Sequence, residues 1–105
     1  MFKDNFMHQI QTLSTSYFQN MGFDQETIDS LIAQGLSDLE KNVARFEREL
    51  SKDSPNLKHV ADVAHTIKGI LGNLGLEEQA ALFAKIEKLT QTNQLEEIKT
   101  LLKKI

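Results

Sequence analysis

The chain has 105 residues, enough for one domain with a modest core and too few for two. It contains no cysteine, which excludes disulfides and thiol nucleophiles and is typical of a reducing compartment. The net charge of −3 argues against non-specific nucleic-acid binding, and no apolar run approaches the roughly 18 residues of a membrane span. We therefore expect a cytoplasmic domain over residues 1–105 that has no cofactor of its own and binds neither nucleic acid nor membrane.

Apolar residues recur at helical spacing from the N-terminus onward. One stripe predicts a first helix, with Phe2, Phe6, Ile10, Leu13 and Tyr17 on its buried face. Asp24 is a suitable N-cap for a short second helix through Ile28, Leu31 and Ile32, which we expect to end near Gly35. We interpret residues 1–34 as an N-terminal helical extension that caps the bundle, forms a dimer contact or helps to choose partners.

Four further helices are expected after Gly35. The third carries a seam of Leu36, Leu39, Val43, Phe46 and Leu50. Its charged residues are interpreted as a solvated face, namely Glu40, Lys41, Arg45, Glu47, Arg48 and Glu49. The last two helices carry apolar stripes of Leu82, Ile86 and Leu89, and of Leu95, Ile98, Leu101 or Leu102, and Ile105. The connections are short and no long period-two pattern occurs. We predict an all-α fold, an antiparallel four-helix bundle over residues 35–105 with additional N-terminal helices.

The fourth helix is the most informative segment. Ser54-Pro55 is a favourable start, and Gly75 is a suitable left-handed residue to end a helix that runs to about Asn73. At about 100° per residue, an apolar arc forms on one side. It contains Val60, Val63, Ala64, Ile67, Ile70, Leu71 and Leu74. His65 lies opposite this arc, so we expect an exposed imidazole.

The neighbours of His65 on the helical wheel are unusual. Ala61, Lys68, Gly69 and Gly72 all fall within about 60° of it. Each glycine inside a helix costs about 1 kcal/mol relative to alanine, and an exposed face offers no packing reason for two of them. Glycine permits close approach of another surface to the backbone. The pattern predicts a bare surface around a histidine, with Ala61, Gly69 and Gly72 as docking positions.

Phosphoryl transfer is the chemistry that this surface suits. A neutral imidazole is a good nucleophile, and Lys68, one turn from His65, is placed to meet the charge of a phosphoryl group. The transition state is loose, so an oriented ring and one cation suffice when the partner brings the metal ion. Ordinary solvated polar surface is the alternative interpretation. His8 and His59 are assigned no site, and no set of convergent metal ligands is visible.

The segment from Ala64 to Gly69, followed by Gly72, Asn73, Leu74, Gly75 and Leu76, resembles the signature of histidine phosphotransfer (HPt) domains. That signature is His-x-Leu-Lys-Gly, with a further glycine ten positions after the histidine. Ile67 replaces the usual leucine, and Ile70 and Leu71 occupy positions where the family often has serine or alanine. The likeness extends over roughly residues 35–105 and includes Leu82, Ile86 and Glu87 on the next helix.

The resemblance implies that His65 is phosphorylated, that Lys68 assists the phosphoryl group and that Gly69 leaves room for a receiver domain. It also implies that Glu87 orients the imidazole. The expected partners are response-regulator receiver domains or a hybrid histidine kinase, with Mg²⁺ on the receiver. The expected function is a phosphorelay shuttle between receiver aspartates, a phosphoryl carrier without enzyme activity of its own.

Two alternatives remain open at this point. One is the phosphorylated domain of a chemotaxis-type kinase, which belongs to a much longer chain. A start Met and a last helix that reaches Ile105 favour a free-standing protein. The other is a helical adaptor that binds partners without carrying phosphate, which loss of His65 or Lys68 would have favoured.

Overall fold

A computed structural model describes residues 4–102 of the chain, with side chains from residue 8 onward. Five helices follow one another in this part: α1 (Asp4–Asn20), α2 (Gln25–Leu50), α3 (Leu57–Asn73), α4 (Glu77–Gln91) and α5 (Leu95–Leu102). No strand occurs among the described residues. The predicted all-α bundle is confirmed. None of the described helices is long and apolar enough to cross a membrane.

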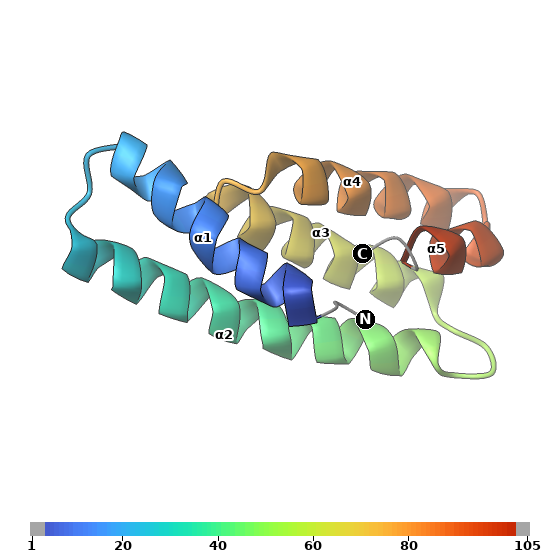
Figure 1. Ribbon diagram of the computed structural model, residues 1–105. Helices are drawn as coiled ribbons and strands as arrows, with labels where there is room; N and C mark the ends of the chain where they lie inside the picture. The colour runs from blue at the N-terminus through green and yellow to red at the C-terminus, as the bar shows by residue number, and fades with distance from the viewer. Residues whose placement is uncertain (1–3, 103–105) are drawn as a thin grey trace.

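Helix α3 is the centre of the bundle. It packs against α2 on one side and α4 on the other, while α1 crosses α2 and α5 folds back on the end of α4 (Figure 1). The molecule is elongated, measuring 45 × 22 × 19 Å. Phe46 of α2 and Phe83 of α4 meet edge to face in the core, with ring centroids 5.7 Å apart. The site-bearing helix is thus held along two flanks and leaves its remaining face to solvent.

Helix α2 continues through Gly35, so the predicted break between a second and a third helix is wrong. Asp24 does cap this helix, because its carboxylate accepts a hydrogen bond from the backbone N–H of Thr27. A Cβ at Gly35 would lie 2.7 Å from Leu74 Cδ2. The glycine therefore lets α2 approach the end of α3 closely.

The buried face of α1 also differs from the prediction. Ile10, Ser14 and Phe18 are buried, whereas Leu13 and Tyr17 are exposed. The Ser14 hydroxyl donates a 2.8 Å hydrogen bond to the carbonyl oxygen of Leu74, which makes a polar residue acceptable in this seam. Of the other residues predicted at the chain ends, Phe2 and Ile105 lie outside the described residues, as does the side chain of Phe6.

The start of α3 lies slightly later than expected. Asn56, and not Ser54, is the N-cap, and its side-chain oxygen accepts hydrogen bonds from the backbone N–H groups of Lys58 and His59. The carboxylate of Glu49 in turn accepts the N–H of Asn56 at 2.8 Å. Glu49 is buried, which corrects the prediction that it belongs to a solvated face.

The end of α3 is as predicted. Gly75 adopts a left-handed conformation with φ of 79°. The N–H of Leu76 bonds to the carbonyl of Leu71 at 2.9 Å, and that of Gly75 to the carbonyl of Gly72 at 3.0 Å. This pair of bonds is a Schellman motif, which satisfies the last carbonyls of the helix and turns the chain into α4.

Candidate functional site

The apolar arc predicted for α3 anchors the helix in the core. Val60, Val63, Ala64, Ile67, Leu71 and Leu74 are buried. Ile70 is half-buried, at the edge of the α2 contact. Because this arc is fixed between two helices, the opposite face of α3 cannot rotate inward. His65 is accordingly exposed, with 67% of its side chain accessible.

Three of the predicted site residues come together in space. The carboxylate oxygen Oε1 of Glu87, on α4, lies 3.3 Å from Nδ1 of His65 and 3.1 Å from Nζ of Lys68. Lys68 and Glu87 are partly shielded, with 33% and 27% of their side chains accessible. The imidazole and the ammonium group of α3 therefore share one carboxylate oxygen of α4.

The protonation state of Glu87 follows from these contacts. Burial by itself acts to raise the pKa of this carboxyl group. The hydrogen bonds from Lys68 and His65, together with the positive charge of Lys68, outweigh that effect, so the pKa of Glu87 is lowered. The carboxylate is therefore ionised at neutral pH and can only accept hydrogen bonds.

The surface around His65 is bare. A Cβ added to Gly69 or to Gly72 would have no neighbouring atom within 4 Å. Both glycines are exposed, and Ala61, one turn before His65, is half-buried. Within the described part of the chain, the space beside these two glycines is open, so another protein can approach the backbone near the imidazole.

The other two histidines lie apart from this cluster. His8 is exposed on α1. His59 is exposed on α3, about 120° around the helix from His65, and lines a groove toward α2. Within the described residues, no group of three or more His, Asp or Glu side chains is placed to hold a metal ion.

Sequence reasoning overlooked the cations at the end of α2: it treated Arg45 and Arg48 as ordinary solvated surface and gave no role to Lys52, which follows the helix. The structure places these three residues along the same groove as His59. The spacing of three residues between Arg45 and Arg48, which puts both on one face of a helix, was the available signal. The position of α3 opposite that face could not be deduced from the spacing alone.

Comparison with known proteins identifies the family of the chain. The sequence model of the Hpt domain matches residues 30–104, well over half of the chain, and this range includes His65, Lys68 and Glu87. No curated protein and no solved structure matches the chain. The Hpt match and the helical bundle together establish that the chain belongs to the histidine phosphotransfer (Hpt) domain family, whose members act in phosphorelays with receiver domains and kinases.

Proposed function

We propose that His65 accepts a phosphoryl group from the aspartyl phosphate of a receiver domain and passes it to the aspartate of another receiver. The observation that carries this proposal is the imidazole itself. Its side chain is 67% accessible, and its Nδ1 atom is held by an ionised carboxylate at 3.3 Å. The shuttle has no activity of its own, because each transfer needs a partner.

The contact with Glu87 assigns the two ring nitrogens different roles. An ionised carboxylate is an acceptor, so Nδ1 of His65 must carry the hydrogen. Nε2 then keeps its lone pair. In this arrangement Nε2 is the nucleophile, and Glu87 is a positioning residue that fixes the tautomer.

The proposed step is balanced without loss of a proton. The lone pair of Nε2 forms a bond to phosphorus while the bond between phosphorus and the partner's aspartate oxygen breaks. The aspartate leaves as a carboxylate. The phosphorylated ring keeps its Nδ1 hydrogen, and the negative charge of Glu87 offsets the positive charge that develops on the ring. Transfer to the second receiver reverses these bond changes.

Lys68 supplies the cation for this reaction. Its ammonium group is already on the same oxygen of Glu87 as the imidazole, at 3.1 Å. Because Lys68 lies one turn from His65, a short movement of its flexible side chain brings it to the phosphoryl oxygens. In this proposal Lys68 exchanges Glu87 for the phosphoryl group and so stabilises the phosphorylated form.

The receiver is proposed to dock over Ala61, Gly69 and Gly72. The two glycines leave open space beside the imidazole, which allows the partner's aspartate to come within bonding distance of Nε2. The receiver is expected to bring the Mg²⁺ ion that neutralises charge on the transferred group. The chain itself is proposed to need no cofactor.

Incubation with a phosphorylated receiver tests the proposal. We expect the protein to gain a phosphate that is labile in acid and stable in base, which is the behaviour of phosphohistidine. His65→Gln should abolish the label. His8→Gln, the matched control at the exposed histidine of α1, should keep it.

A second incubation, with a kinase catalytic domain and ATP, separates the other readings of the fold. Label from the kinase alone would contradict the receiver-to-receiver shuttle and indicate a chemotaxis-type kinase domain. Absence of label from both donors would indicate an adaptor that carries no phosphate.

A further inference from the structure

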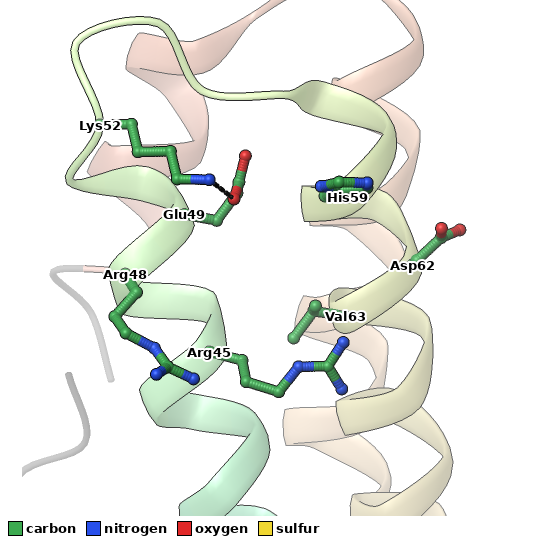
Figure 2. Close-up of a pocket in the computed structure, with 7 residues that line it drawn as sticks. All are labelled: Arg45, Arg48, Glu49, Lys52, His59, Asp62 and Val63. Atoms are coloured by element: carbon green, nitrogen blue, oxygen red, sulfur yellow. Dashed lines mark hydrogen bonds and ion pairs between the residues drawn. The ribbon is translucent and has the colours of Figure 1, made fainter.

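A groove of about 360 Å³ lies between the C-terminal half of α2 and the N-terminal half of α3. Two cationic side chains, Arg45 and Arg48, come from α2, a third, Lys52, comes from the connection after this helix, and the other wall comes from α3 (Figure 2). We call this surface the basic groove. Its lining residues are Arg45, Arg48, Glu49, Lys52, His59, Asp62 and Val63.

Three cations line the basic groove against the two carboxylates of Glu49 and Asp62, and this positive charge is not neutralised evenly. Lys52 pairs with Glu49 at 2.7 Å, and the second oxygen of Glu49 accepts the N–H of Asn56. Within the described residues, neither Arg45 nor Arg48 forms an ion pair with a carboxylate. Arg45 makes only a 3.3 Å hydrogen bond to the side chain of Asn42. Two guanidinium groups are thus available to an anion.

The composition of the basic groove favours a protein segment over a small molecule. Pockets for small ligands are lined mostly by hydrophobic and aromatic side chains, whereas six of the seven residues that line this groove are polar or charged. Arg45 and Arg48 are three residues apart on α2, which corresponds to about 4.5 Å along the helix axis. An extended peptide advances about 6.6 Å for every two residues, so alternate carboxylates can reach these two long, flexible arginine side chains.

The basic groove is separate from the candidate transfer site. His59 lies about 120° around α3 from His65 and about 9 Å along its axis, on the side that faces α2. Glu87 and Lys68 meet on the opposite side, toward α4. A segment in the groove therefore lies beside a domain docked over His65 and leaves the imidazole free.

We propose that the basic groove binds an extended acidic segment of a partner protein, with carboxylates on Arg45 and Arg48. Guanidinium groups bind carboxylates through paired hydrogen bonds, and they keep their charge at all physiological pH values. The chain as a whole carries a charge of −3, so an acidic segment is attracted only where cations are concentrated. This binding does not depend on phosphorylation of His65.

The probe is a peptide of about eight glutamates, titrated into the full-length protein and followed by backbone amide resonances. We expect the largest shifts at residues of the basic groove, and an affinity that falls as salt is added. Arg45→Glu combined with Arg48→Glu should weaken binding by about tenfold or more. Arg45→Gln with Arg48→Gln keeps much of the side-chain length and should weaken it in the same direction.

Matched controls make the outcome decisive. Lys85→Glu combined with Lys99→Glu reverses two exposed charges on α4 and α5 and should leave the affinity within about twofold. His65→Gln should bind the peptide with the affinity of the parent protein. Peptide binding can therefore be tested independently of phosphoryl transfer. Equal loss of affinity in the control and the arginine variants would overturn the proposal. So would binding of pyrophosphate more tightly than the peptide, which would indicate a small-anion site.

Discussion

At the residue scale, the cluster depends on one oxygen atom that serves two donors. Oε1 of Glu87 contacts both the imidazole of His65 and the ammonium group of Lys68, so each contact influences the other. The exposure of His65 was predictable from the sequence, because the apolar arc of α3 fixes which face is buried. The contact with Glu87 was not derivable from spacing, since it joins residues 22 positions apart on different helices. It was expected only from the resemblance to a family.

Glu87→Gln tests the positioning role. The amide has nearly the same shape, but it carries no charge to offset that of the phosphorylated ring, and its nitrogen is a donor. We expect phosphoryl uptake from a receiver to slow by about tenfold, which corresponds to about 1.4 kcal/mol, and the fold to be retained. Rapid-quench measurement with a labelled receiver gives the rate. Glu78→Gln, an exposed glutamate of the same helix, is the control, and an equal rate in both variants would refute the role.

Gly69→Gln tests the bare surface. A Cβ at this position meets no atom of the described chain, so the folded protein accommodates the side chain. The helix should gain up to about 1 kcal/mol of stability, because glycine is a poor helix former. Transfer should slow, because the new side chain stands where the receiver approaches.

The measurement for Gly69→Gln pairs urea denaturation with the transfer rate. Thr66→Gln, at an exposed position about 100° around the helix from His65, should transfer at a rate closer to that of the parent. A parent-like rate for Gly69→Gln would mean that close approach at this glycine is not required.

At the scale of elements, the long helices were predictable and several of their details were not. Leu13 and Tyr17 fit a helical stripe as well as Ser14 and Phe18 do, since residues three and four apart share a face. The carbonyl of Leu74 decides between the two faces by accepting a hydrogen bond from Ser14. From the sequence alone, Gly35 likewise indicates the end of a helix. The structure shows why a glycine stands inside α2, because a larger residue would meet Leu74.

The turn between α3 and α4 depends on Gly75. Its φ of 79° is unfavourable for other residues by roughly 1–2 kcal/mol, and a Cβ there would overlap the ring of Tyr17. We expect Gly75→Ala to lower the free energy of unfolding by more than the backbone term alone. In a Tyr17→Ala background, the same substitution should cost only about the backbone term.

A double-mutant cycle by urea denaturation measures the coupling between Gly75 and Tyr17. A positive coupling is expected, because removal of the ring removes the steric part of the cost. If the cost of Gly75→Ala were the same in both backgrounds, the ring of Tyr17 would not be in contact with the turn in solution.

At the scale of the whole molecule, contacts between helices set where the site lies, and these contacts were the least predictable feature. The sequence predicted that the helix now seen as α3 starts at Ser54-Pro55. The structure uses Asn56 as the N-cap, because Glu49, near the end of α2, holds its backbone N–H. The same carboxylate binds Lys52. Glu49 thus ties the α2–α3 connection together and sets where the site-bearing helix begins.

This tie predicts a pH dependence of stability. The hydrogen bond from Lys52 and then that from the N–H of Asn56 lower the pKa of Glu49 below its ordinary value of 4.5. A carboxyl group whose pKa is lowered in the folded state stabilises the fold at pH values above its ordinary pKa. This contribution is lost as the pH falls through the pKa of the folded state. Glu87 and Asp24, whose pKa values are also lowered, act in the same direction. The free energy of unfolding should therefore decrease as the pH falls below about 4.5.

Urea denaturation of Glu49→Gln across the same pH range isolates the contribution of this one group. The amide oxygen still accepts the N–H of Asn56, so α3 keeps its start, but no proton is taken up at this position on acidification. We expect Glu49→Gln to be less stable than the parent at neutral pH and to lose less stability in acid. Glu40→Gln removes a carboxylate from the exposed face of the same helix and should follow the parent's pH profile. If the two variants had the same profile, the contacts of Glu49 would not hold the α2–α3 connection in solution.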